Sequence, residues 1–157
     1  MRHRLYLLCC LAAVTLLHSG CGGLFKRDPG PQLIVDKTAQ TLHGREWELR
    51  AVTIDGNDVV MHVDSKMSLR FDADGQARGN GGVNQFSAGY DFGDDGILAW
   101  EGFTLKKQAG PPEFQEKEKI YLGALRRTTR AIAGKVMLTL QSDGGEVILT
   151  FLKPGTL

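Results

Sequence analysis

The sequence predicts an α+β, β-rich fold: a curved antiparallel sheet, partly barrel-like, packed on one long helix and followed by a C-terminal hairpin. Three observations support this prediction. Apolar and polar residues alternate in several short runs between residues 41 and 100. The period becomes helical after Pro111 and Pro112. Two more alternating runs then end the chain. The sheet and the helix each have one apolar face, and the simplest way to bury both faces is to pack the helix against the sheet.

The first twenty residues indicate a lipoprotein signal peptide outside the fold. A basic start is followed by an uncharged, leucine-rich run at residues 5–17, which is too short for a comfortable membrane span. Small residues and then Cys21 follow, as in a bacterial lipobox, although His18 stands where leucine is usual. We expect Cys21 to become the first mature residue and to carry palmitate or similar acyl chains. An uncleaved anchor or an ordinary signal peptide cut nearby is the alternative.

Acylation would place the protein in the bacterial cell envelope. Each methylene buried in the bilayer contributes about 0.8 kcal/mol to membrane binding. One acyl chain therefore binds a protein to the membrane reversibly, whereas two or three chains anchor it permanently. Gly22 replaces the aspartate that commonly retains lipoproteins in the inner membrane, which favours the outer membrane and a periplasmic domain. Residues 21–40 are predicted to form a flexible tether, with at most a short edge strand at 33–35, before a domain at residues 41–154.

Cysteine usage and charge limit the class of protein further. Two of the three cysteines, Cys9 and Cys10, lie in the signal peptide, so the mature domain is expected to have no disulfide. Processing also removes Arg2 and Arg4, which leaves 17 basic against 18 acidic residues. This balance gives no indication of nucleic acid as a partner.

Strands are expected wherever apolar and polar residues alternate. In the first strand, Trp47, Leu49 and Ala51 share the buried face. The expected strands lie at residues 47–51, 59–61, 67–71, 86–92 and 97–100, and the turns between them at 55–58, 72–75 and 93–96.

The helix is expected to begin at Pro111 and to end at a Gly134 cap. Its predicted buried face consists of Phe114, Tyr121, Leu125, Thr128 and Ile132. Glutamates near its beginning and three arginines near its end suit the helix dipole. Those arginines are Arg126, Arg127 and Arg130.

The final hairpin has a predicted register. A two-residue turn at Asp143 and Gly144 would pair three apolar residues with three others across the hairpin. The expected pairs are Leu140 with Val147, Leu138 with Leu149, and Val136 with Phe151.

A glycine-rich stretch at residues 79–90, Gly-Asn-Gly-Gly-Val-Asn-Gln-Phe-Ser-Ala-Gly-Tyr, is the most distinctive part of the chain. Glycines clustered before a strand indicate a bulge or a sharp change of direction. A phosphate cradle is the alternative, but the stretch lacks the Gly-Lys-Ser/Thr ending and opens no helix. Asn84 is expected to cap a turn with its side chain.

With these residues in place, the chain resembles the META/HslJ-like domain. The matching pattern is Leu42-x-Gly44-x-x-Trp47-x-Leu49, Leu69-x-Phe71, Gly79-x-x-Gly82-x-Asn84-x-Phe86-x-x-x-Tyr90, Glu118, and Leu122-x-x-Leu125. The resemblance implies a compact β-rich fold with one helix, often lipid-anchored, and an association with heat or antibiotic stress and envelope integrity. It implies no agreed activity or catalytic residue. Gly79, Gly82, Asn84, Phe86 and Tyr90 are the candidate structural signature. Many members carry cysteine where this chain has Val83 and Gly110, so neither half of a possible bridge remains.

The sequence indicates no catalytic residue, metal site or cofactor. His43 and His62 have neither metal-ligand spacing nor a neighbouring nucleophile. The aspartates at 72, 74, 94 and 95 lack the further carboxylates of a calcium loop and indicate hairpin turns instead. Arg126, Arg127 and Arg130 are candidate contacts for anionic lipid or lipopolysaccharide phosphates, with dipole complementation on a solvated face as the alternative.

We therefore expect a non-enzymatic, outer-membrane-anchored periplasmic lipoprotein that acts in envelope stress or antibiotic tolerance by binding a partner or ligand. The alternative is a pilotin-like assembly factor for an outer-membrane secretion component, holding a hydrophobic peptide or acyl chain in the hollow of the sheet. A large apolar cavity between sheet and helix would favour the alternative, and a filled core the first hypothesis. A buried carboxylate or histidine pair in a cleft would favour an enzyme.

Overall fold

The computed structural model describes residues 39–61, 66–93 and 95–156. The predicted signal peptide, Cys21, the tether up to residue 38, His62 and Asp94 lie outside these residues. The described elements are α1 (Ala39–Leu42), β1 (Glu46–Ile54), β2 (Asn57–Val59), β3 (Ser68–Phe71), β4 (Gln76–Asn80), β5 (Gln85–Phe92), β6 (Leu98–Lys106), α2 (Pro112–Arg126), β7 (Arg130–Ala133), β8 (Met137–Gln141) and β9 (Val147–Leu152).

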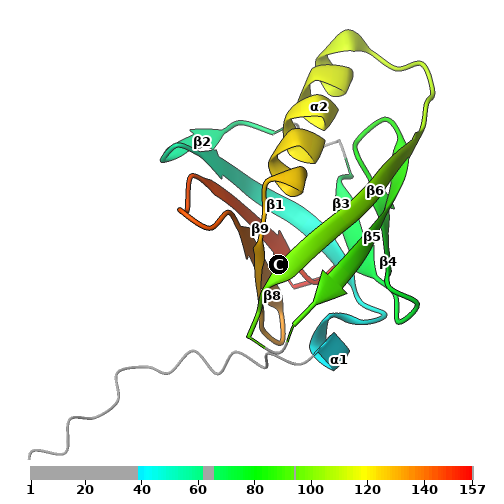
Figure 1. Cartoon of the computed structure of the whole chain (residues 1–157). Coiled ribbons are helices and arrows are strands. Elements are labelled where there is room, and N and C mark those ends of the chain that lie inside the picture. Colours follow the sequence, from blue (N-terminus) through cyan, green and yellow to red (C-terminus); the bar gives the residue numbers. More distant parts are fainter. Residues whose placement is uncertain (1–38, 62–65, 94, 157) are drawn as a thin grey trace, which may run out of the picture. The chain divides into compact units, whose positions relative to one another are not determined.

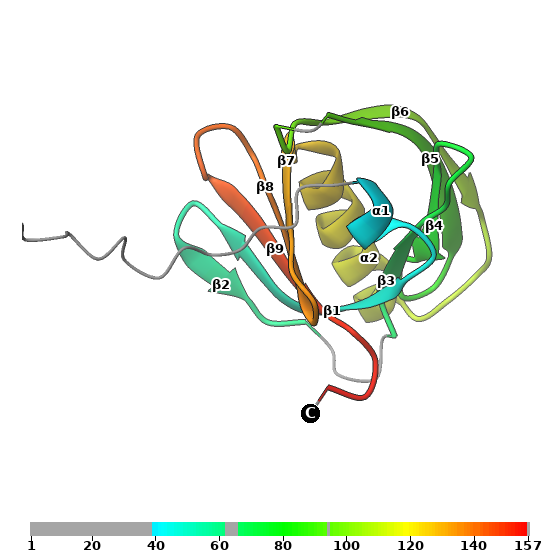
Figure 2. The ribbon, with the colours of Figure 1, turned by 90° about the horizontal axis from the view of Figure 1, so that it is seen from below.

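All strand pairs are antiparallel, in the order β6-β5-β4-β3-β1-β9-β8-β7, with β2 attached to β1. The sheet curls around α2, so that its two end strands approach each other (Figures 1 and 2). There the Leu98 N–H donates to the Thr129 carbonyl at 2.8 Å, and the Ala131 N–H donates to the Gly96 carbonyl at 2.9 Å. This half-barrel around one helix confirms the predicted fold class.

The hollow of the sheet is a packed hydrophobic core. Side chains from α2 and from the strands around it are fully buried there, among them Trp47, Phe71, Tyr121, Leu125 and Phe151. Tyr121 lies at the centre and meets the Phe151 ring edge-on at 6.3 Å between centroids. Helix α2 therefore fills the concave side of the sheet, as Figure 2 shows from below.

Strand β1 departs from simple alternation. Trp47 is fully buried as predicted, but Leu49 and Ala51 are only half-buried. A register shift between Leu49 and Ala51 in the pairing with β9 makes Val52 the next fully buried residue. A bulge of this kind bends a strand and changes which residues face inward. It lets β1 pair with β3 at its beginning and with β2 at its end.

Strand β6 is longer than predicted. It continues past Trp100 to Lys106, and its register against β5 shifts between Ser87 and Gly89. Gly102, at φ +51°, accommodates the extra residue there. The bulge interrupts the alternation on which the sequence prediction depended, and the strand resumes beyond it.

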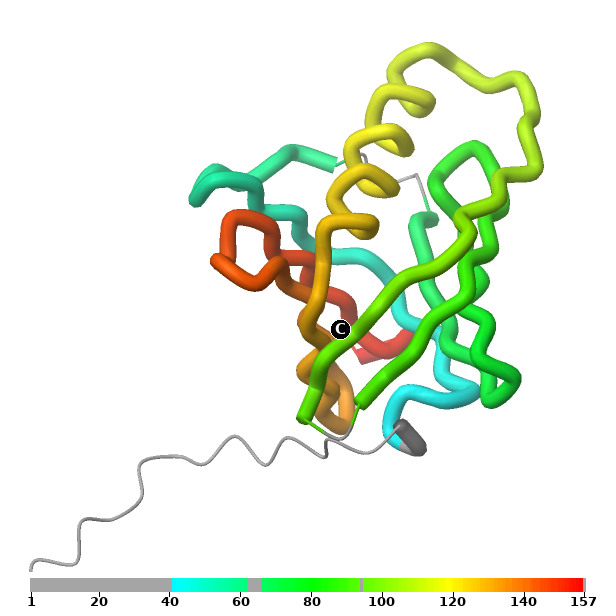
Figure 3. The backbone as a smooth tube through the Cα atoms, viewed as in Figure 1, coloured from blue at the N-terminus to red at the C-terminus, as the bar shows by residue number. Residues whose placement is uncertain are grey.

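The helix ends earlier than predicted. Helix α2 stops at Arg126, and the Thr128 hydroxyl donates to the Leu125 carbonyl at 2.8 Å just beyond it. Residues 130–133 form β7 instead, because their backbone groups pair with β8. Ile132 is therefore a strand residue, and Gly134 lies in the β7–β8 turn rather than at a helix cap. Figure 3 shows the chain leaving the helix directly into this strand.

The predicted register of the final hairpin was wrong by two residues. Leu140 pairs with Leu149, and Leu138 pairs with Phe151. The turn is longer than two residues: Ser142 and Val147 close it, and Gly145 adopts φ +77°. A shift of two residues leaves every side chain on the same face of the sheet, so the apolar residues predicted to be buried on β8 and β9 still face the core. Val136 has moved beyond the paired residues and is 48% exposed.

Candidate functional site

The glycine-rich stretch forms the turn between β4 and β5. The Gly81 N–H donates to the Asn84 carbonyl at 2.7 Å, and the Gly82 N–H donates to Asn80 Oδ1 at 2.8 Å. Gly82 has φ +112°, a conformation open to glycine and strained for other residues. The predicted sharp change of direction is confirmed, and it lies directly against α2.

A buried carboxylate ties this turn to the helix. Glu118 of α2, 5% exposed, accepts hydrogen bonds from the Val83 N–H at 3.1 Å, the Asn84 N–H at 2.6 Å and Asn84 Nδ2 at 2.5 Å. Asn84 Oδ1 accepts in turn from the Gln108 N–H. Asn84 therefore joins the turn, the helix and the segment before the helix, well beyond the local cap that its sequence position suggests. Because all three donors point at one carboxylate, these contacts form a structural joint.

Two glycines in the joint leave no room for a side chain. A Cβ on Gly81 would lie 2.5 Å from Glu118 Oε2. A Cβ on Gly79 would lie 2.7 Å from the ring of Phe86, its cross-strand partner. The Phe86 ring thus packs over Gly79 and reaches Tyr121 edge-on, at 6.0 Å between centroids.

Val83 and Gly110 are also neighbours in this joint. A Cβ on Gly110 would lie 2.6 Å from Val83 Cγ1 and 3.4 Å from Val83 Cβ. The two positions at which related domains are expected to carry cysteine therefore face one another.

Tyr90 closes the other end of the signature. Its hydroxyl donates to the Asp72 carbonyl at 2.8 Å, and its ring meets Phe71 edge-on at 4.8 Å. Burial, with a smaller contribution from Asp72 and Asp74, raises the pKa of Tyr90 to about 12. The signature residues thus hold the fold together, and none of them opens onto a cleft as a reactive group.

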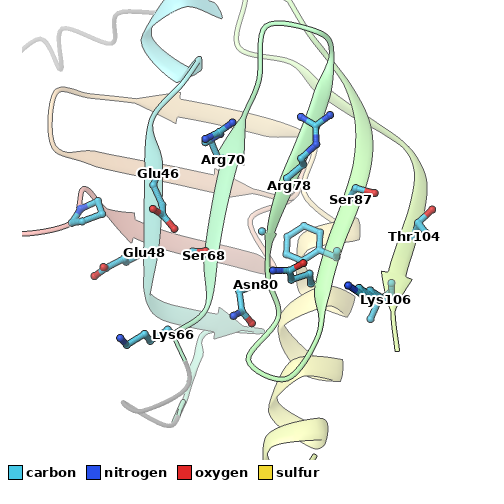
Figure 4. Close-up of a pocket in the computed structure, with 15 residues that line it drawn as sticks. Glu46, Glu48, Lys66, Ser68, Arg70, Arg78, Asn80, Ser87, Thr104 and Lys106 are labelled. Atoms are coloured by element: carbon cyan, nitrogen blue, oxygen red, sulfur yellow. The ribbon is translucent and has the colours of Figure 1, made fainter. Parts of the chain in front are cut away.

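The outer surface of the sheet contains the candidate binding site. The outward face of β1, β3, β4, β5 and β6 contains a hollow of about 830 Å³ (Figure 4). Two rows of polar side chains cross it from strand to strand, each residue paired with the next. One row is Glu46, Arg70, Arg78, Ser87 and Thr104, and the other is Glu48, Ser68, Asn80, Gln85 and Lys106.

Asp72 organises the arginine end of this hollow. Its carboxylate accepts from Arg70 Nε at 2.6 Å and from Arg78 Nη1, while Arg78 Nη2 reaches Asp74 at 3.1 Å. The hydrogen bond from Arg78 lowers the pKa of Asp74, and the same pair raises the pKa of Arg78. These bonds hold two like charges side by side on neighbouring strands, an arrangement that costs free energy without such a counterion.

The helix-end arginines do not form one group. Arg126 lies over the Phe103 ring, 4.7 Å from its centroid, and Arg127 follows the last turn of α2. Arg130 begins β7 and lies 3.7 Å from Asp143. All three side chains are exposed. Contact with an anionic surface stays a prediction for them.

Within residues 39–61, 66–93 and 95–156, no three His, Cys, Asp or Glu side chains gather closely enough to hold a metal ion. Asp72 and Asp74 are occupied by arginines, and Asp95 Oδ1 accepts from the Ile97 N–H within its turn. His43 packs beside Tyr90 at 6.4 Å between ring centroids. Over the same residues, neither helix has the length and apolar character needed to cross a membrane.

A curled antiparallel sheet around one helix, with a glycine turn tied to that helix, defines a class of small β-rich domains. Residues 40–155 match the META domain family, and the chain belongs to this family. No curated protein matches the chain.

Solved structures share the fold. A protein from Burkholderia xenovorans, solved by NMR, has a TM-score of 0.63 and 23% identity, over 74% of this chain and 86% of that one. A DUF4847 family protein from Bacteroides vulgatus has a TM-score of 0.54 and 12% identity, over 72% and 94%. Another protein solved by NMR has a TM-score of 0.54 and 18% identity, over 74% and 94%. At these identities the similarity concerns the fold alone.

Proposed function

We propose that this META domain protein is a non-enzymatic lipoprotein of the bacterial envelope. Acyl chains on Cys21 hold it in the outer membrane, and its domain faces the periplasm and binds a partner or ligand. This binding contributes to envelope stress or antibiotic tolerance. The observation that carries the proposal is the polar hollow of about 830 Å³ on the outward face of the sheet.

The hollow suits binding because it lies on a rigid scaffold. Five hydrogen-bonded strands form its floor, and on the opposite side of the sheet the core is packed by α2. A site on strands is held more accurately than a site on loops. The volume lies in the range of small-ligand pockets.

The polar groups of the domain also support a binding role over catalysis. Glu118, the buried carboxylate, has its oxygens committed to three donors. Nucleophilic chemistry needs a nucleophile within reach of a base that is itself oriented. Ser68, Ser87 and Thr104 line the hollow, and no His, Lys or carboxylate is hydrogen-bonded to any of these three in the described part of the chain.

The pilotin-like alternative needs an apolar chamber between sheet and helix. That space holds Tyr121, Leu122 and Leu125, each at most 3% exposed. The packed interior therefore supports the first hypothesis over a hydrophobic guest inside the sheet.

Two measurements in intact cells test the proposal. Labelled palmitate should enter the wild-type protein and not Cys21→Ala, and only the wild type should stay with the outer membrane. A photo-crosslinking residue at Thr104, in the hollow, should capture a partner, while the same residue at Thr150, on the outward face of β9, should capture far less. Absence of palmitate, or equal capture from both positions, would contradict the proposal.

A further inference from the structure

The hollow on the outward face owes its shape to side-chain size. The three central strands present the short side chains of Ser68, Asn80 and Ser87 beside the longer side chains of Arg70, Arg78 and Gln85. The flanking strands present long ones: Glu46 and Glu48 on β1 and Lys106 on β6. A low centre between higher margins on β1 and β6 forms an open trough that runs along the strands; Figure 4 shows the side chains that line it.

The floor of the trough is built for hydrogen bonding in both directions. Serine hydroxyls and the Asn80 and Gln85 amides can each donate and accept. The Phe86 ring beneath them is 3% exposed, so it offers no stacking surface. A ligand rich in hydroxyl groups matches this floor, whereas a flat aromatic ring or an acyl chain would leave its polar groups without partners.

The charges give the trough a direction. Its β1 margin carries Glu46 and Glu48, and its β6 margin carries Lys106. Arg70 and Arg78 lie at one end of the trough, and Lys66 and Lys106 lie toward the other (Figure 4). Asp72 and Asp74 balance the charges of Arg70 and Arg78, so the attraction for an anion comes from Lys66 and Lys106, and Glu46 and Glu48 repel it from β1.

Two of these cations keep donors for a ligand. Lys106 has no ion-pair partner among the residues that the structure describes. Arg70 is fixed through Nε by Asp72, which leaves its terminal nitrogens free to donate. On the side away from β1, Lys106 can therefore bind a phosphate or carboxylate by a charge-assisted hydrogen bond. The carboxylates on β1 can accept from hydroxyl groups.

We propose that the trough binds an anionic saccharide, with its phosphate or carboxylate toward Lys106 and its hydroxyl groups along the serine and amide floor toward Glu46 and Glu48. This inference rests on the proposed binding function and names the ligand class. In an envelope, phosphate would mark a lipopolysaccharide-type saccharide and carboxylate a peptidoglycan-type saccharide.

The test is an NMR titration of the ¹⁵N-labelled full-length protein in a non-ionic detergent. The probes are glucosamine 6-phosphate, N-acetylmuramic acid, neutral N-acetylglucosamine and inorganic phosphate. One or both anionic sugars should shift the amide signals of Ser68, Asn80, Ser87 and Lys106 and should bind more tightly than the neutral sugar and phosphate. Whichever anionic sugar binds more tightly indicates the source.

Matched variants locate the site. Ser87→Tyr fills the centre of the trough and should abolish the shifts, while Thr150→Tyr, at an outward position of β9, should leave them unchanged. Lys106→Gln should weaken binding about fivefold, as expected for the loss of one exposed charge-assisted contact. Lys119→Gln, on the exposed side of α2, should not change it.

Three results would overturn the inference: no shift with either anionic sugar, equal binding of the neutral sugar or of phosphate alone, or unchanged binding by Ser87→Tyr and Lys106→Gln. If the sugars fail while crosslinking at Thr104 still captures a partner, the ligand class is wrong and the binding function stands. If crosslinking at Thr104 fails as well, the binding function fails with it.

Discussion

The contact between Val83 and Gly110 allows a disulfide to be added across the joint. A Cβ at residue 110 would lie 3.4 Å from the Cβ of residue 83, close to the 3.5–4.5 Å typical of a disulfide. Replacing valine with cysteine also removes the Cγ1 atom that would stand only 2.6 Å away. We therefore expect Val83→Cys with Gly110→Cys to oxidise spontaneously to a bridge.

The expected gain follows from the length of chain that the bridge closes. Residues 83 and 110 bound a loop of roughly 30 residues, for which loop-closure entropy predicts about 3.5 kcal/mol of stabilisation at 25 °C. In a domain of this size, that corresponds to a rise of about 10–15 °C in the unfolding temperature. Loss of the half-buried valine lowers the stability of both the oxidised and the reduced form by about 1 kcal/mol relative to the wild type.

Thermal unfolding of the oxidised and the reduced double variant measures this gain within one protein. Cys9, Cys10 and Cys21 are replaced by alanine beforehand, so that the new pair holds the only thiols. Gly110→Ala alone should destabilise the domain, because its methyl group meets the Val83 side chain. An oxidised form that melts at or below the temperature of the reduced form would refute the geometry argued here.

Three further predictions concern the joint and the core. Glu118→Leu leaves three donors without an acceptor and should lower the free energy of unfolding, measured in urea, by about 2–4 kcal/mol. The control Glu116→Leu, at an exposed position of the same helix, should change this free energy by less than about 0.5 kcal/mol. Gly79→Ala should cost about 2 kcal/mol or more because its methyl group meets the Ser68 carbonyl oxygen and the Phe86 ring. Gly123→Ala in α2, with open space around its Cβ, should stabilise by about 0.5–1 kcal/mol; equal effects at the two glycines would contradict the packing. The pKa of Tyr90 is about 12 in the folded state against about 10 when unfolded, so its contribution to stability is complete below pH 10 and is lost between about pH 10 and 12. Phenolate absorbance should show a step near pH 12 that Tyr90→Phe removes, and a step near pH 10 that disappears in Tyr90→Phe would refute the burial of this hydroxyl.

Local alternation was sufficient to predict most strands. The buried faces at Met67, Leu69 and Phe71, and at Phe86 and Ala88, are where the sequence pattern places them. In these runs every second side chain meets the core, so the signal is contained in the strand itself.

Predictions from sequence periodicity were wrong where pairing with a strand from another part of the chain determines the structure. Thr128 and Ile132 continue the helical spacing of Tyr121 and Leu125, yet β8 needs the backbone of residues 130–133 as a strand. In the final hairpin, two registers that differ by two residues bury the same faces, and only the length of the turn separates them.

The candidate site could be predicted only in part. The family resemblance located the signature stretch and Glu118, but Glu118 accepts hydrogen bonds from residues 34 and 35 positions earlier, and no local pattern reveals this contact. A carboxylate at the helical spacing of the buried Tyr121, Leu122 and Leu125 was the available signal. The outward hollow depends on the strand order β1-β3-β4-β5-β6, which brings distant polar residues into rows.

The place of β1 in the sheet has a consequence for how the domain assembles. This first strand lies between β3 and β9, and Leu49 pairs with Phe151 near the end of the chain. As the ribosome makes the protein from its N-terminus, β1 waits with one edge unpaired until the last strand emerges. Such a high contact order slows folding. Loss of β9 would therefore open the middle of the sheet rather than shorten its margin.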